Sequence, residues 1–238
     1  TAISRNKNKI TGVSAAMQNY NDKQDEVASS IFYNKPVQKY YDGVSLDAIW
    51  AVRSLGIDPT NGQEIYLDKK GNRTYTYRVS DQVVCGDKLP DFQGTAGFMF
   101  SYKGIELNAT FRFQYGAQMY NQTLVDKVEN VDPLKNADRR VLYDRWKNVG
   151  DIAKYKAITN TTATMPTSRF IEQQNYITLS SLNLSYEFNW KGLEQLGIER
   201  LKLSAIGNDV FRVSSVKMER GINYPFARTF SLAAQITF

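Results

Sequence analysis

The last eleven residues of the chain, 228–238, alternate between apolar and polar side chains and end on an aromatic residue. Phe230, Leu232, Ile236 and Phe238 share one phase of this alternation, and hydroxyl or amide side chains fill most of the other. Successive side chains of a β-strand point to opposite faces, so the pattern predicts a strand with one apolar and one polar face. A soluble β-sandwich can contain such a strand. Strands of about 10 residues with aromatic ends are also typical of transmembrane β-barrels.

The clearest hairpin signal runs from Thr95 to Tyr115 around a Lys103-Gly104 turn, because two-residue turns with glycine are typical of antiparallel hairpins. In its second strand, apolar residues alternate with charged and amide residues. Charged side chains between aromatic ones are stable if one face meets water and the other meets hydrocarbon. We therefore expect two sets of residues: lipid-facing Ile105, Leu107, Phe111 and Phe113, and lumen-facing Glu106, Asn108, Arg112 and Gln114.

Further segments bring the expected sheet to about eight strands. Residues 177–189 alternate with a change of phase that predicts a β-bulge near Ser180-Ser181. Residues 201–205 alternate in a single phase. Three weaker strand candidates complete the set: residues 1–10, 44–53 and 63–67.

The connections between these strands alternate between short and long. The short ones are 58–62, 103–104 and 190–199, and the long ones are 12–43, 72–94, 116–175 and 210–227. This segregation is typical of a membrane barrel with tight turns at the periplasmic end and large loops at the extracellular end. A soluble Greek-key fold has no reason to separate its loops in this way.

The longest connection contains a helix signal and three candidate contact residues. Asp132 can cap a helix, Pro133 suits its first turn, and apolar residues follow at helical spacing to about residue 145. Tyr143, Arg145 and Trp146 lie in or beside this segment and could contact a substrate or a partner protein. We favour the alternative that they pack the loop onto itself, because large ordered loops need small cores of their own.

Composition removes several classes of function. The 238 residues include no histidine and a single cysteine, Cys85, so we expect no catalytic His pair, no metal site and no cofactor. The net charge of +6 is dispersed, which argues against a nucleic-acid-binding face. No apolar run approaches the length of a membrane-spanning helix. The chain starts without a signal peptide, so we expect either a processed protein or the end of a longer one.

Short motifs are spread over nearly the whole chain. They are RNKNKI at 5–10, GIDPTNGQEIY at 56–66, DKKG at 68–71, SYKG at 101–104, RW at 145–146, TSRF at 167–170, YITL at 176–179, GNDVF at 207–211, YP at 224–225 and RTF at 228–230. In this order they resemble the C-terminal part of the SusC/RagA family of TonB-dependent outer-membrane transporters. The segment after Phe211 lacks the acidic DPE motif common in the family, so we expect that outer loop to differ.

The resemblance implies an all-β protein in which residues 1–238 form the C-terminal strands of a plugged barrel of roughly 22 strands with long extracellular loops. The plug and early strands would precede this chain and carry the contact with TonB. The implied function is import of oligosaccharides or oligopeptides across the outer membrane of a Gram-negative cell, with a SusD-like surface lipoprotein as a lid. The barrel-assembly machinery would read the terminal residues Phe230, Leu232, Ile236 and Phe238.

Two other functions compete with this interpretation. A complete small barrel of about eight strands would act as a passive pore or an adhesin, but its polar, lysine-rich first segment is a poor partner for the last strand. A soluble carbohydrate-binding or enzymatic β-domain would need convergent acidic residues or a histidine, and the sequence offers neither pattern.

Overall fold

The computed structural model describes residues 1–30, 33–132, 134–188, 190–195, 197–217 and 228–238. The chain divides into two units. Unit 1 consists of Thr1–Asn6, Pro90–Ala117 and Gln174–Phe238, and unit 2 of Lys7–Leu89 and Gln118–Gln173. Both units are therefore built from segments that are distant in the sequence.

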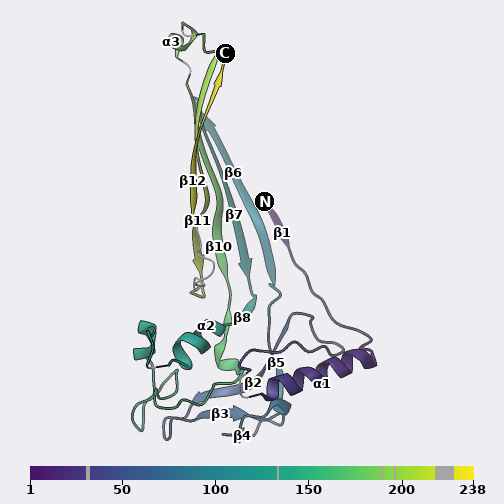
Figure 1. Ribbon diagram of the computed structural model, residues 1–238. Helices are drawn as coiled ribbons and strands as arrows, with labels where there is room; N and C mark the ends of the chain where they lie inside the picture. The colour runs from purple at the N-terminus through teal and green to yellow at the C-terminus, as the bar shows by residue number, and fades with distance from the viewer. Residues whose placement is uncertain (31–32, 133, 189, 196, 218–227) are drawn as a thin grey trace. The chain divides into compact units, whose positions relative to one another are not determined.

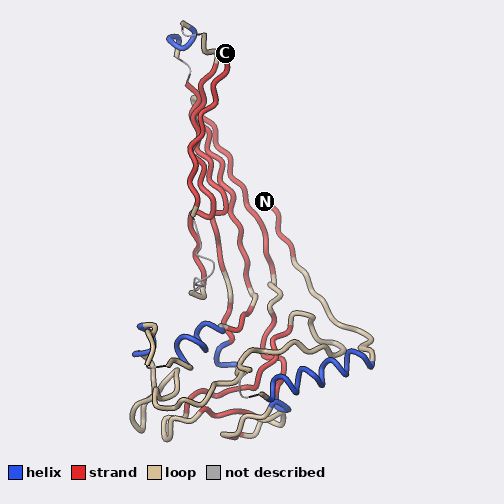
Figure 2. The backbone as a smooth tube through the Cα atoms, in the orientation of Figure 1, coloured by secondary structure: helices blue, strands red, loops and turns tan. Residues whose placement is uncertain are grey.

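Unit 1 is an antiparallel sheet whose strands pair in chain order, as Figures 1 and 2 show. From edge to edge its strands are β1 (Ala2–Ser4), β6 (Phe92–Tyr102), β7 (Ile105–Tyr115), β10 (Tyr176–Phe188), β11 (Arg200–Ser214) and β12 (Thr229–Thr237). A short helix, α3 (Lys191–Glu194), lies in the connection between β10 and β11. The predicted hairpin and the predicted terminal strand are confirmed.

Local backbone geometry explains the turn and the bulge in this sheet. Lys103 and Gly104 have φ angles of 45° and 84°, the left-handed conformation that a two-residue hairpin turn requires. The register of β10 shifts between Leu179 and Ser181 against both neighbouring strands, which confirms the predicted bulge. The bulge moves the apolar phase from Ile177 and Leu179 to Leu182 and Leu184.

The sheet has two open edges. β1 pairs only with β6, and β12 pairs only with β11 among the described strands. Because no described strand joins β12 to β1, these residues form an open sheet and not a closed barrel.

Unit 2 contains two small sheets and several helical turns. The first sheet has the order β4 (Arg73–Thr74), β3 (Glu64–Leu67), β2 (Ala48–Ile57) and β5 (Gln82–Asp87), and the second pairs β8 (Gln118–Tyr120) with β9 (Ile171–Gln173). The helical segments are α1 (Ala15–Ser29), α2 (Gln122–Leu124), a π-helical turn at Val125–Glu129, and 3₁₀ turns at Val79–Asp81, Arg139–Leu142 and Ser168–Phe170.

The expectation of about eight strands in one sheet is wrong for the described residues. The candidates at 44–53 and 63–67 became β2 and β3 of unit 2, and the short connection 58–62 is a turn within that unit. The reason is burial on both faces. Residues 48–52 of β2 are all less than 9% exposed, so their imperfect alternation reflects a small core and not a two-faced wall.

The helix expected over residues 132–145 is also wrong. Among the described residues of that stretch, only Arg139–Leu142 is helical, as a 3₁₀ turn. The Asp132 carboxylate accepts a hydrogen bond from the Leu134 N–H two residues later, which is a local turn and not a helix cap. Pro133 and the Tyr224-Pro225 motif lie outside the described residues.

Candidate functional site

The register of unit 1 separates apolar and polar side chains across the whole sheet. Residues paired directly across an antiparallel ladder share a face. Leu184 of β10 pairs with Leu107 on one side and with Ala205 on the other, and Ala205 pairs with Leu232 of β12. One apolar row therefore crosses four strands.

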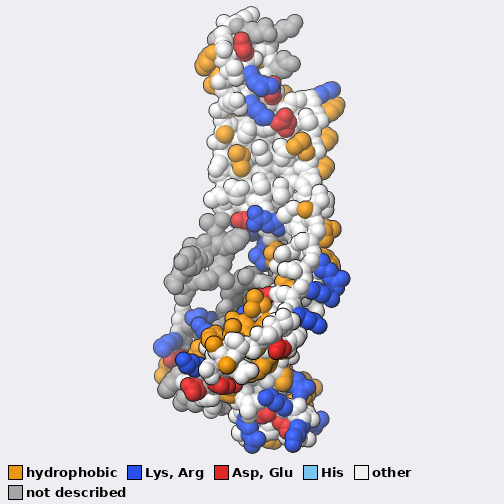
Figure 3. Space-filling view, turned by 90° about the vertical axis from the view of Figure 1, so that its right-hand side faces the viewer, with side chains coloured by type: hydrophobic (Ala, Val, Ile, Leu, Met, Phe, Trp, Pro, Cys, Tyr) orange, Lys and Arg blue, Asp and Glu red, His pale blue; other side chains and the backbone are white. Residues whose placement is uncertain are grey.

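The apolar face is extensive and uncovered among the described residues. Leu232 is 89% exposed and Phe230 is 70% exposed, and hydrophobic side chains lie at the surface of the molecule in Figure 3. The predicted lipid-facing residues Ile105, Leu107, Phe111 and Phe113 all lie on this face, because each pairs with a residue of the same apolar rows. Soluble monomers rarely expose a contiguous apolar surface of this kind. The face therefore indicates an apolar medium or a covering partner.

The opposite face carries the predicted lumen-facing residues Glu106, Asn108, Arg112 and Gln114. The Glu106 carboxylate accepts hydrogen bonds from the Lys202 ammonium at 2.6 Å and from the Ser185 hydroxyl at 3.3 Å. Arg200 and Glu187 form a second ion pair at 2.9 Å. The Glu106–Lys202 pair spans from β7 to β11 across β10, and the Glu187–Arg200 pair joins the neighbouring strands β10 and β11. This face is therefore both polar and cross-linked.

Tyr143, Arg145 and Trp146 do not form one exposed surface. Arg145 is buried, and its guanidinium donates to the carbonyls of Val141 at 2.9 Å and Lys156 at 2.8 Å and to that of Val128. Burial lowers the pKa of Arg145 from its ordinary value. Arg145 therefore holds loop segments together, as the packing alternative expects.

Trp146 packs within unit 2 as well. Its indole N–H donates to the carbonyl of Pro59 at 3.0 Å. A Cβ added at Gly62 would lie 2.6 Å from the indole ring, so the ring occupies the space beside that glycine. Of the three candidate residues, only Tyr143 is largely exposed, with 52% of the residue accessible.

A buried ion network in unit 2 was not predicted. The Arg169 guanidinium donates to both carboxylate oxygens of Glu64, at 3.1 and 2.8 Å, and to Glu129 at 2.6 Å. The side chains of Arg169 and Glu64 are each 7% exposed, and that of Glu129 is fully buried. Burial alone would lower the pKa of Arg169, but the two carboxylates reverse this and raise it above its ordinary value. Arg169 lies in the TSRF motif and Glu64 in the GIDPTNGQEIY motif, but neither motif carries information on the partner of its charged residue.

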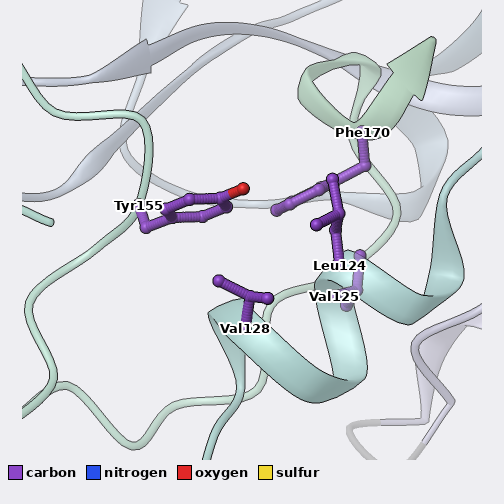
Figure 4. Close-up of a cluster of buried hydrophobic side chains, with 5 residues drawn as sticks. All are labelled: Leu124, Val125, Val128, Tyr155 and Phe170. Carbon is purple, nitrogen blue, oxygen red and sulfur yellow. The ribbon is translucent and has the colours of Figure 1, made fainter. Parts of the chain in front are cut away.

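The network adjoins a hydrophobic cluster formed by Leu124, Val125, Val128, Tyr155 and Phe170, whose side chains point toward one another in Figure 4. The Arg169 guanidinium lies 4.5 Å from the centre of the Phe170 ring. Unit 2 is therefore organised like a small water-soluble domain, with an apolar core and paired buried charges.

Two kinds of feature are absent from the described residues. No group of three or more acidic or cysteine side chains is placed to hold a metal ion. None of the helices combines the length and the apolar content needed to cross a membrane.

A curated protein and several solved structures are similar to this chain. No family model matches it. It is 30% identical over 156 residues to TonB-dependent receptor P39 of Formosa agariphila, an alignment that covers 63% of this chain and 15% of that receptor. The chain is therefore similar in sequence to part of a TonB-dependent receptor.

Solved structures agree on the fold. The RagAB peptide importer in its open-open state matches 83% of this chain and 23% of the solved chain, with a TM-score of 0.70 and 16% identity. A second structure, of the RagAB peptide transporter, matches 87% of this chain and 24% of the solved one, with a TM-score of 0.68 and 18% identity. The predicted resemblance to the SusC/RagA family is confirmed. The chain spans about 15% of the curated relative and about a quarter of the solved chains.

Proposed function

We propose that this chain forms the C-terminal part of the wall of a TonB-dependent outer-membrane barrel that imports oligosaccharides or oligopeptides. Two names support the transport class: the curated relative is called a TonB-dependent receptor, and the solved relatives are called a peptide importer or transporter. No reaction is assigned to the chain. Its role is to form part of the barrel wall and of the loops that line the path of the nutrient, and so to contribute to the choice of nutrient.

The separation of the two faces of the unit 1 sheet is the observation that carries this proposal. In hydrocarbon every backbone polar group needs a partner, so membrane-spanning sheets are closed barrels. The open edges at β1 and β12 then pair with strands that this chain does not supply. Strands of 11 residues such as β6 and β7 reach about 26 Å across the membrane when tilted by about 45°, close to the apolar band of such barrels.

The topology also supports an orientation. One end of the sheet holds the Lys103-Gly104 turn, the paired ends of β10 and β11 at Phe188 and Leu201, and the C-terminal end of β12. Both segments of unit 2 leave from the strand ends at the other side. We assign the first end to the periplasm and unit 2 to the extracellular side, where it would meet a SusD-like lipoprotein. Tyr143 is its exposed candidate contact.

The other partners follow from the same proposal. TonB would bind the N-terminal part of the complete protein. The barrel-assembly machinery would read the apolar phase of β12, that is Phe230, Leu232, Ile236 and Phe238. Membrane lipid would cover Ile105, Leu107, Phe111 and Phe113.

Single-cysteine labelling of the full-length protein in outer membranes tests the proposal. With Cys85→Ser as the background, Phe111→Cys and Arg112→Cys place a thiol on opposite faces of β7. A membrane-impermeant maleimide should label position 112, and a lipid-dissolved maleimide should label position 111. The reverse result would refute the assignment of the two faces, and with it the barrel function.

A further inference from the structure

The charges on the polar face of unit 1 are paired at one end of the sheet and unpaired at the other. Near the Lys103-Gly104 turn, Glu106 pairs with Lys202, and Glu187 pairs with Arg200. Toward the opposite end the face carries Arg112 and Arg212. Neither arginine forms an ion pair with any acidic side chain among the described residues.

The two arginines lie on one row of the register. Arg112 of β7 pairs with Thr178 of β10, and Thr178 pairs with Arg212 of β11. The arginines are therefore on the same face and two strands apart, a backbone separation of about 10 Å. Two positive charges are thus held near each other without a counter-charge, which creates a positive potential at this level of the face.

The two guanidinium groups differ in exposure. Arg212 is partly buried: the centre of its guanidinium lies 3.9 Å from the centre of the Tyr176 ring, and its Nε–H is buried without an acceptor among the described residues. Stacking on an aromatic ring fixes the guanidinium plane, so the terminal N–H groups of Arg212 are the ones that can meet a ligand. Arg112 is exposed and forms part of the wall of a depression of about 350 Å³, together with Thr95 and Tyr176.

We propose that Arg112 and Arg212 form an oxyanion-binding row in the lumen, so that the imported oligomer is one that carries carboxylate groups. The planar guanidinium fork matches a carboxylate with two parallel hydrogen bonds, and a pair of forks suits an acidic oligomer that presents several carboxylates in sequence. This inference rests on the proposed function, because it requires the polar face to line the transport pathway. The carboxylates belong either to an acidic oligosaccharide or to an acidic peptide.

Thiol modification rates in the full-length protein test the row. In the Cys85→Ser background, Thr95→Cys places a thiol opposite Arg112, and Ser101→Cys places one opposite the ion-paired Glu106 on the same strand. Each is treated with a sulfonate-bearing and a trimethylammonium-bearing methanethiosulfonate. The ratio of anionic to cationic rates should be about fivefold higher at position 95 than at position 101. At physiological salt this effect comes mainly from Arg112, one strand away at about 5 Å, with a smaller contribution from Arg212, three strands away at about 14 Å.

Charge-neutralised variants and competitors complete the test. Arg112→Gln should reduce the ratio at position 95 most of the way toward that at 101, and Arg212→Gln should reduce it by a smaller amount, because Arg212 lies two strands farther from position 95. The control Arg200→Gln removes an arginine of the same face that is already paired, and it should leave the ratio unchanged. Oligogalacturonide should slow the labelling of position 95 if the substrate is an acidic sugar, and oligoglutamate if it is an acidic peptide. A neutral malto-oligosaccharide of equal length should not.

Three results would overturn the proposal. They are equal ratios at 95 and 101, a ratio insensitive to both arginine variants, and no labelling at 95 by either reagent, which would mean that another part of the protein covers the row. The failure of the proposed function is distinguishable from these. It would appear as labelling of Phe111→Cys by the water-soluble reagents at a rate comparable to that of Thr95→Cys.

Discussion

The buried arginine of unit 2 allows a prediction of known size. Replacing Arg169 with methionine keeps most of the side-chain volume but leaves Glu64 and Glu129 buried with no cation between them. Removing one partner from a buried ion pair costs about 3–5 kcal/mol, because an uncompensated charge remains in the interior. We expect this cost to appear as local opening of unit 2, since the network joins Gln118–Gln173 to the sheet that contains Glu64.

Hydrogen–deuterium exchange of the full-length protein measures this opening. Amides of Gln122–Glu129 and of β2 should exchange roughly 10²- to 10⁴-fold faster in Arg169→Met, because each 1.4 kcal/mol corresponds to a factor of ten. The matched control is Arg200→Met, which breaks an exposed Arg–Glu pair and should change exchange by less than about sixfold.

A rescue variant separates charge from packing. If the cost comes from orphaned carboxylates, replacing Glu64 and Glu129 with leucine in the Arg169→Met background should restore most of the protection, because apolar replacement of a whole buried ion network is often neutral. Unchanged exchange in Arg169→Met would refute the reasoning. So would a triple variant that is less protected than the single one.

Three further predictions concern the sheet and the alkaline stability of unit 2. Phe111→Arg should lower the free energy of unfolding in urea, measured from vesicles, by about 2–4 kcal/mol if position 111 lies near mid-membrane. Arg112→Ala should lower it by less than about 1 kcal/mol, and equal losses for the two variants would contradict the face assignment. Deleting Phe238 should reduce the amount of protein assembled in the outer membrane, and unchanged surface levels would argue against its role as an assembly signal. Burial raises the pKa of Tyr77 to about 12, while a tyrosine in an unfolded chain ionises near pH 10. The contribution of the neutral Tyr77 side chain to the free energy of unfolding is therefore complete below pH 10 and is lost between pH 10 and 12. Exchange of β5 amides should rise over that window, less so in Tyr77→Phe, and an identical profile in both proteins would exclude Tyr77 as the cause.

The strands of unit 1 were predictable because a single-layer sheet leaves a direct pattern in the sequence. Each residue of β7 faces one of two different surroundings, so the alternation from Ile105 to Tyr115 maps onto the two faces without interference from other layers. The bulge was predictable for the same reason. Only an irregularity in pairing can move Leu179 and Leu182 to the same face.

Unit 2 was not predictable by these rules, because its stability depends on distant contacts. Arg169 lies 105 residues from Glu64 and 40 residues from Glu129 in sequence, and isolated charged residues are ordinarily interpreted as surface positions. The expected helix at 132–145 had suitable local spacing, but Leu134 and Leu142 are 93% and 66% exposed. Without an apolar surface to pack against, local helix propensity is insufficient.

The two units of this chain follow opposite rules of burial. In unit 2, Phe170 and Val125 are fully buried and even charged residues are paired in the interior, as in a domain folded in water. In unit 1, Phe230 and Leu232 are among the most exposed apolar residues. The hydrophobic effect acts on every part of a chain in water, so a single aqueous environment cannot account for both the buried apolar residues of unit 2 and the exposed ones of unit 1. The proposed function accounts for both arrangements, because it assigns lipid to the apolar face of unit 1 and water to unit 2.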